Sequence, residues 1–265
     1  MKRLYIALVL IATFHNAFSK EKKSVENKDY QFDGIISREV LENYLARSST
    51  FGSLLHLTLE DDLRMIKNTG VKFAGRAIWM WGGESKIDEL VRVGEPFAKR
   101  IHEIDPDIIL QGAIFEVVTK DINNVAIPES VFEEFGVPKE PRNFSYKAML
   151  YPFGHRHNHW SKDSSVPDMS RLETRMWFFY VAKRWIDMGI EAIHFGQVEI
   201  MDDWDRSHRH WRDIMKRIRD YAKKNARRHI VLSDAHVPSG GIVHDGNLMF
   251  DLHSFPSRPK SVKGK

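Results

Sequence analysis

The chain has 265 residues with no cysteine, 13 histidines and a formal net charge of +4. This length suits one large domain or two small ones, and a hydrophobic content of 42% excludes a chain that is disordered by composition. The positive charge is small and scattered over apparent helix faces next to acidic residues, which argues against a nucleic-acid partner.

The amino terminus has the features of a secretory signal peptide. Positive charges precede an apolar run over residues 4–14, and the small residues Ala17 and Ser19 are suited to cleavage before Lys20. The apolar run is too short to span a bilayer comfortably. We therefore expect a signal peptide over residues 1–19, a periplasmic or secreted protein, and no stable membrane insertion after cleavage. The alternative is a buried or anchoring helix.

Apolar and amphipathic segments alternate after a polar linker over residues 20–33. The predicted strands cover residues 34–37, 71–81, 107–118, 190–199, 229–237 and 247–255. The predicted helices cover residues 37–46, 58–70, 87–104, 170–188 and 207–228. Ser37 and Thr58 are suited to capping the first two helices, and Pro96 is expected to kink or divide the third. A long excursion without a regular period is expected at about residues 119–151.

The order of the predicted elements favours an α/β fold. Strands that are apolar throughout and alternate with helices are typical of a parallel sheet covered by helices. No glycine-rich phosphate-binding motif follows any strand, which argues against a nucleotide-binding fold. We expect a single (β/α)8 TIM-type barrel over residues 34–265. Only about six strands are found. Either two further strands lie within residues 33–57 and 144–153, or the barrel is incomplete at its carboxyl end, which the absence of a helix after the last strand favours slightly.

Two glutamates at strand ends are the candidate catalytic residues. On a regular strand Ile193, Phe195, Gln197 and Glu199 share one side, and that side turns from apolar to polar at its carboxyl end. Glu116 ends the strand before it in the same way. Glycosidases place two carboxylates on either side of the bond that they cleave, one as acid and one as nucleophile or base. We assign these roles to Glu199 and Glu116, with an acid that caps or pairs with a helix as the alternative for each.

Further side chains near the predicted strand ends are suited to binding a sugar. Indole rings stack on sugar rings, and the tryptophans at these positions are Trp79, Trp81, Trp160 and Trp204. The polar residues expected to bind hydroxyl groups are Gln197, Asp202, Asp234, His236 and His253. Core packing is the alternative for each tryptophan.

The chain resembles the (β/α)8-barrel glycoside hydrolases. The resemblance rests on the signal peptide and on the segments Trp79-Met-Trp81, Ala113-Ile-Phe-Glu116 and His194-Phe-Gly-Gln-Val-Glu199. It implies a secreted enzyme that cleaves glycosidic bonds in an oligo- or polysaccharide substrate without a cofactor. The Asn-Glu-Pro motif that carries the acid/base in many retaining families does not occur in the sequence.

Two other functions are compatible with the sequence. Three alternate histidines (His155, His157 and His159) and two Asp-x-His pairs (Asp234 with His236, and Asp251 with His253) could serve a zinc- or manganese-dependent hydrolase. In the main hypothesis these histidines bind no metal and instead contact substrate hydroxyls or loop backbone. The other alternative is a non-catalytic glycan-binding barrel, which an incomplete fold would favour.

Overall fold

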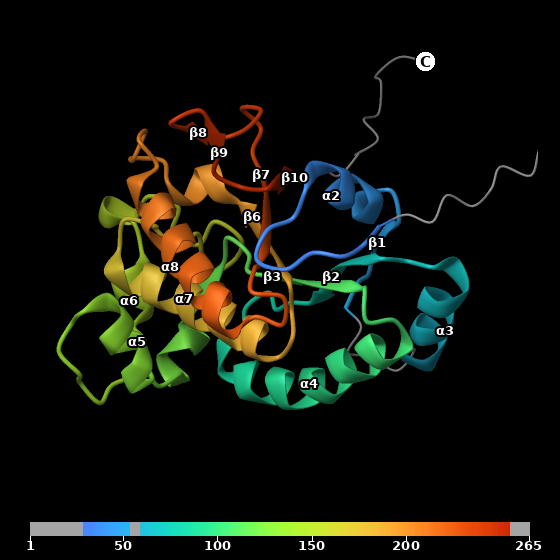
Figure 1. The fold of residues 1–265 in the computed structure, drawn as a ribbon. Helices are drawn as coiled ribbons and strands as arrows, with labels where there is room; N and C mark the ends of the chain where they lie inside the picture. Colours follow the sequence, from blue (N-terminus) through green and yellow to red (C-terminus); the bar gives the residue numbers. More distant parts are fainter. Residues whose placement is uncertain (1–28, 54–58, 255–265) are drawn as a thin grey trace, which may run out of the picture.

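A six-stranded parallel sheet organises the fold (Figure 1). The computed structural model describes residues 29–53 and 59–254. The sheet has the order β1-β2-β3-β6-β7-β10. Its strands are β1 (Ser48–Thr50), β2 (Phe73–Ile78), β3 (Ile109–Ala113), β6 (Ala192–Gln197), β7 (Leu232–His236) and β10 (Leu252–His253). Two small antiparallel pairs lie outside this sheet: β4 (Val118–Thr119) with β5 (Ser164–Ser165), and β8 (Val243–His244) with β9 (Asn247–Leu248).

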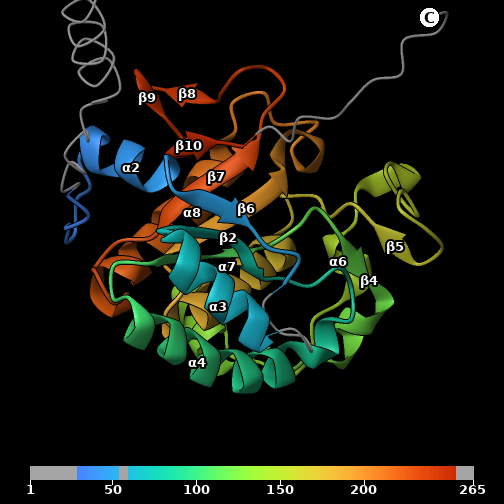
Figure 2. The same cartoon turned by 90° about the vertical axis from the view of Figure 1, so that its right-hand side faces the viewer.

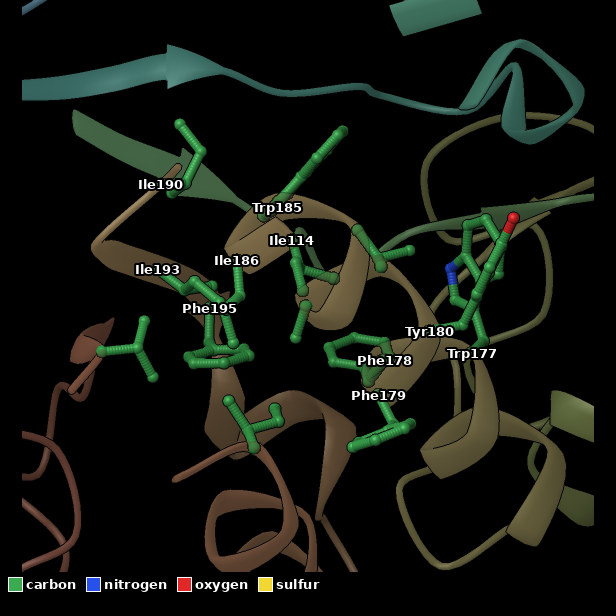
Figure 3. Close-up of a cluster of buried hydrophobic side chains, with 14 of the residues drawn as sticks. Ile114, Trp177, Phe178, Phe179, Tyr180, Trp185, Ile186, Ile190, Ile193 and Phe195 are labelled. Atoms are coloured by element: carbon green, nitrogen blue, oxygen red, sulfur yellow. The ribbon is translucent and has the colours of Figure 1, made fainter. Parts of the chain in front are cut away.

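Helices cover one face of the sheet. The helices of the structure are α2 (Arg38–Leu45), α3 (Leu59–Thr69), α4 (Ile87–Ile104), α5 (Glu129–Phe135), α6 (Tyr146–Met149), α7 (Leu172–Asp187) and α8 (Arg209–Asn225). Helices α3, α4, α7 and α8 lie along one face of the sheet (Figures 1 and 2). Their apolar side chains form one core with the strand residues that point to that face. Figure 3 shows the centre of this core, where Phe178 of α7 faces Phe195 of β6. Helix α7 is buried along most of its length because both the sheet and α8 cover it.

The opposite face of the sheet curls around a cavity. One cavity of about 520 Å³ is lined by residues of all six strands, so this face is concave. The layer at the amino-terminal ends of the strands is apolar and includes Phe73, Ile109 and Leu232, which pack with α2. The next layer towards the carboxyl ends is polar, because Gln111 of β3 and Asp234 of β7 both point into the cavity. The polar side chains of the concave face therefore lie on the carboxyl-terminal side of an apolar layer.

Helix α2 closes the amino-terminal end of the concave face. Its Tyr44 is fully buried, and the phenol oxygen accepts a hydrogen bond from Arg228 at 2.8 Å. The Arg228 guanidinium also lies 3.9 Å from the centre of the Phe32 ring and donates to the buried carboxylate of Glu191 at 2.6 Å. This cluster joins the segment before α2 to the start of β6.

Several predicted elements are confirmed. Ser37 caps α2, since its hydroxyl accepts a hydrogen bond from the Val40 N–H at 3.2 Å. Helix α4 has the predicted bounds and continues through Pro96 without division. The apolar segments before Glu116 and Gln197 form β3 and β6. The α/β class and its parallel sheet are thus confirmed.

Other expectations differ from the structure. The predicted strand at residues 34–37 is wrong, because only an isolated bridge joins Asp33 and Ile35, and the first strand of the sheet is β1. The long excursion contains α5, α6 and a short 3₁₀ helix at Lys120–Asn124. Within the described residues the sheet has six strands and β1 does not pair with β10, so a closed eight-stranded barrel is not confirmed.

The predicted signal peptide and residues 20–28 of the predicted linker lie outside the described residues. Across the part of the chain that the structure describes, no helix has the length and hydrophobicity needed to cross a membrane.

Candidate active site

Two connected cavities lie along the carboxyl ends of the strands. The cavity on the concave face, of about 520 Å³, shares Thr50, Arg76 and His236 with a second cavity of about 810 Å³. The second cavity, called here the aromatic cleft, is lined by residues that follow β1, β2 and β3 and by the last residues of β6 and β7. Ligand sites in parallel α/β proteins form at this edge of the sheet.

Four aromatic side chains line the aromatic cleft. Trp81 is 45% exposed, and its ring centre lies 5.4 Å from that of Phe115 and 5.0 Å from that of Trp160. Trp79 packs edge-on against Phe115 at 5.7 Å. The Trp160 indole N–H donates to the backbone carbonyl of Glu116 at 2.8 Å. These rings present apolar faces beside polar groups, which is the arrangement that binds sugar rings.

Glu116 is the carboxylate of the aromatic cleft. Its side chain is buried, and Gln197 holds both oxygens: Oε1 accepts from the side-chain amide at 2.7 Å and Oε2 from the backbone N–H at 2.9 Å. Gly196 makes this contact possible, because a Cβ at that position would lie 1.9 Å from Oε2. Gly196 also has φ +61°, a conformation that glycine adopts without strain.

A buried polar chain crosses the concave face next to the cleft. Asp234 accepts hydrogen bonds from Gln111 Nε2 at 2.5 Å and from His194 Nδ1 at 2.8 Å, and also from the Ser254 hydroxyl. On the other side of the His194 ring, Nε2 lies 3.5 Å from the guanidinium of Arg76. The carboxylate of Asp234 is therefore fully engaged within the protein.

His236 belongs to both cavities and is neutral at ordinary pH. Burial lowers the pKa of His236 to about 4, with further lowering by the neighbouring His194 and Arg76. Its ring contacts that of His194 with centres 4.7 Å apart. The buried Nε2 has no hydrogen-bond partner among the described residues, so it is available to a bound ligand.

The structure gathers most of the residues predicted for the site. The aromatic cleft holds Trp79, Trp81, Glu116, Gln197 and His236, together with Trp160. The cavity on the concave face holds Asp234, His236 and His253.

The strand pattern that pointed to Glu199 is wrong. Ile193 and Phe195 face the helices, whereas Gln197 reaches the cleft, because the left-handed backbone at Gly196 interrupts the alternation. Strand β6 ends at Gln197, and Glu199 lies in a short 3₁₀ helix, η4 (Val198–Met201). Glu199 is half-buried and does not line the aromatic cleft.

Two other predicted binding residues also lie away from the cleft. Asp202 is buried and accepts a hydrogen bond from His208 Nδ1 at 2.7 Å, and burial raises the pKa of its carboxyl group. Trp204 is 54% exposed and stacks on His155 with ring centres 5.2 Å apart. Both belong to the segment after η4 rather than to either cavity.

Three residues that line the cavities, Arg76, Gln111 and His194, were not predicted as site residues. Gln111 and His194 are polar residues inside strands that are otherwise apolar, and that pattern could have identified them. Arg76 sits in the middle of β2 in the same way. An uncompensated polar residue in a buried strand is a reason to expect a partner or a ligand.

The histidines proposed as metal ligands make separate contacts. His155 pairs with Asp203 at 2.8 Å, while His157 bonds the Tyr151 carbonyl at 2.8 Å. Asp251 accepts from the Ser233 hydroxyl at 2.7 Å. No group of three or more His, Asp or Glu residues in the described ranges is arranged to hold a metal ion.

Comparison with known proteins finds similarity only to solved structures. No protein-family model and no curated protein matches the chain. A maltogenic α-amylase, AmyB from Thermotoga neapolitana, is 13% identical with a TM-score of 0.44, and the match covers 72% of this chain and 44% of the enzyme. The debranching enzyme from Nostoc punctiforme is 12% identical with a TM-score of 0.44, over 74% of this chain and 41% of that one. TtGalA, an α-galactosidase from Thermus thermophilus in complex with stachyose, is 14% identical with a TM-score of 0.42, over 77% and 41%.

These similar structures are glycoside hydrolases, and the resemblance is one of fold alone. The chain spans less than half the length of each of them, 44% for the amylase and 41% for the other two.

Proposed function

We propose that the chain binds a carbohydrate in the aromatic cleft and hydrolyses a glycosidic bond there, with Glu116 as a catalytic carboxylate. One observation carries this proposal: a carboxylate held by two N–H groups lies in the wall of a cavity of about 810 Å³ that three tryptophans and Phe115 also line. A cavity of this size accommodates a few sugar rings, and indole faces bind them by stacking.

The chemistry requires two groups around the bond that breaks. One donates a proton to the leaving oxygen, and the other attacks the anomeric carbon or removes a proton from the attacking water. Glu116 is suited to one of these roles because Gln197 fixes its orientation. A fixed carboxylate needs little reorganisation as the reaction proceeds.

Two acids are candidates for the second catalytic group. Glu199 was predicted as the partner of Glu116, and it follows Gln197 by two residues. Asp234 lies in the connected cavity, on the concave face. If Glu199 is the partner, Glu199→Gln abolishes turnover as fully as Glu116→Gln does. If Glu199→Gln stays active and Asp234→Asn does not, the partner role belongs to Asp234.

The proposal is tested by reducing-end release from a panel of polysaccharides. We expect release by the wild type and a loss of roughly 10²–10⁴-fold in Glu116→Gln, the range for removal of a general acid or base. Glu129→Gln is the matched control, because Glu129 is an exposed residue of α5 that pairs with Lys139. Release that Glu116→Gln leaves unchanged would refute the assignment of Glu116.

A second function is favoured by the contacts of Glu116 itself. Both of its oxygens are occupied by Gln197, as in a structural carboxylate. In that case the chain is a glycan-binding protein without turnover. It would then bind a polysaccharide of the panel, release no reducing ends from it, and keep its affinity in Glu116→Gln.

We also propose that the chain is exported and that cleavage follows Ser19. The proposal rests on the charged, apolar and small-residue segments of the first 19 residues. Amino-terminal sequencing of the protein from the periplasm and the medium is expected to begin at Lys20. Full-length protein that starts at Met1 and stays in the cytoplasm would contradict export.

A further inference from the structure

Arg76 is turned into the site by an irregularity of β2. Its neighbours two residues away, Ala74 and Ile78, both face the helices, and regular alternation would put Arg76 beside them. The pairing of β2 with β3 shifts register between these two residues, and Arg76 has φ +54°. The side chain consequently lines both cavities of the concave side. A non-glycine residue in the left-handed region is strained, and such strain clusters where function requires a particular orientation.

The guanidinium of Arg76 has few partners. Among the described residues, its guanidinium contacts are the 3.5 Å approach to His194 Nε2 and a position 5.6 Å from the centre of the Phe115 ring. No carboxylate of the described residues lies within 4.0 Å of it, whereas ion pairs hold most of the other half-buried arginines, such as Arg142 and Arg156. A half-buried cation with unused N–H donors at the wall of a cavity is suited to an anionic ligand.

The acidic residues around Arg76 do not serve as its anionic partner. Glu116 is held by Gln197 on both oxygens, and Asp234 is held by the polar chain of the concave face. His236 is neutral, so Arg76 is the cation shared by the two cavities. The charge of Arg76 therefore faces the space between the carboxylates rather than either of them.

We propose that Arg76 binds an anionic group, a carboxylate or a sulfate, on the sugar that occupies the aromatic cleft, so that the substrate is an acidic glycan. This inference rests on the proposed function. The sugar ring stacks on the tryptophans, and its anionic substituent lies at the junction of the two cavities. The planar guanidinium donates two parallel hydrogen bonds to such a group.

The test measures quenching of tryptophan fluorescence by matched pairs of oligosaccharides, since three tryptophans line the cleft. An oligogalacturonate is compared with its methyl ester, and a κ-carrageenan oligosaccharide with its desulfated form. We expect the wild type to bind the charged member of one pair roughly 10- to 100-fold more tightly, the range for a hydrogen-bonded charge pair. The pair that shows the preference identifies the group as carboxylate or sulfate. Added salt should reduce the preference.

Variants assign the preference to Arg76. Arg76→Gln is expected to bind charged and neutral members equally, and Arg76→Lys to keep part of the preference. Arg38→Gln is the control, because Arg38 is exposed on α2 and pairs with Glu42. Circular dichroism and thermal melting establish that each variant is folded.

The outcomes separate this inference from the proposed function. Equal affinity of the wild type for charged and neutral members overturns the inference while the proposed function stands, and so does a preference that survives in Arg76→Gln. Quenching by no sugar of either kind overturns both. If Arg76→Gln does not fold, equal affinity in the wild type still overturns the inference, and Arg76→Lys tests whether a preference depends on Arg76.

Discussion

At the scale of single residues, two left-handed positions determine what the cleft contains. Gly196 in β6 and Arg76 in β2 each interrupt the alternation of their strand. The first brings Gln197 to the carboxylate of Glu116, and the second turns a cation towards the same space. The side chains of Gln197 and Arg76 would both face the helices if β6 and β2 alternated regularly.

Gly196→Ala should disrupt the site more than the fold. The added Cβ would lie 1.9 Å from Glu116 Oε2, so the carboxylate must move away from Gln197. We expect a loss of stability of about 1–3 kcal/mol from the left-handed alanine and the displaced side chain, and a loss of most turnover. Urea denaturation and reducing-end release measure the two effects.

Gly136→Ala is the matched control for this substitution. Gly136 has φ +62°, nearly the same as Gly196, and a Cβ there meets nothing within 4 Å. It should show the backbone strain without the loss of turnover. Equal loss of turnover in the two variants would contradict the role of Gly196.

His236 makes stability depend on acid pH. Its folded pKa of about 4 lies below the ordinary value of 6.5, so the unfolded chain binds a proton first as the pH falls. The stability present above pH 6.5 is therefore lost between 6.5 and about 4. In His236→Gln this loss should be smaller by about 1–2 kcal/mol, after allowance for solvent screening. Urea denaturation at about pH 7 and about pH 5 tests this, and an unchanged difference between the two pH values would contradict it.

At the scale of elements, the concave face depends on how its amino-terminal end is closed. Glu191 directly precedes β6, and its buried carboxylate accepts hydrogen bonds from Arg227 and Arg228 at 2.8 and 2.6 Å. Arg228 in turn contacts Phe32 and Tyr44. Helix α2 and the start of β6 are thus held together through Arg228 and the buried carboxylate of Glu191.

Glu191→Gln should be strongly destabilising. The substitution leaves the half-buried cation of Arg228 without its carboxylate, and breaking a buried pair costs about 3–5 kcal/mol. The control is Asp220→Asn, which removes an exposed pair with Lys216 and should change stability by less than about 1 kcal/mol. Urea denaturation compares the two variants, and an effect of Glu191→Gln as small as that of the control would show that the pair does not hold α2.

At the scale of the whole molecule, the sequence predicts the elements better than their contacts. The amphipathic pattern of α4 and the apolar run of β3 were enough to predict these two elements, because both patterns depend on local spacing. The hydrogen bond between Glu116 and Gln197 joins residues 81 positions apart. It depends on the positive φ of Gly196, which the alternation of apolar and polar residues does not predict. Glu199 was preferred for that reason. Glu116 was predicted within the strand at residues 107–118, and in the structure it follows β3, which ends at Ala113.

The extent of the sheet was harder to predict than its class. Each apolar strand predicts a buried parallel neighbour, but the pattern does not say how many strands pair or whether the sheet closes. Strand β1 is short and largely polar, so it carries no apolar signal, and β10 has only two residues. These are the two edges of the six-stranded sheet.

The most direct test of the central claim is a crystal structure of Glu116→Gln with an oligosaccharide that the wild type cleaves. The claim predicts sugar rings on Trp79, Trp81 and Trp160, and a scissile oxygen or anomeric carbon within roughly 3.5 Å of the carboxamide that replaces the Glu116 carboxylate in this variant. A sugar bound elsewhere on the protein, or one whose glycosidic bonds all lie beyond reach of position 116, would contradict it.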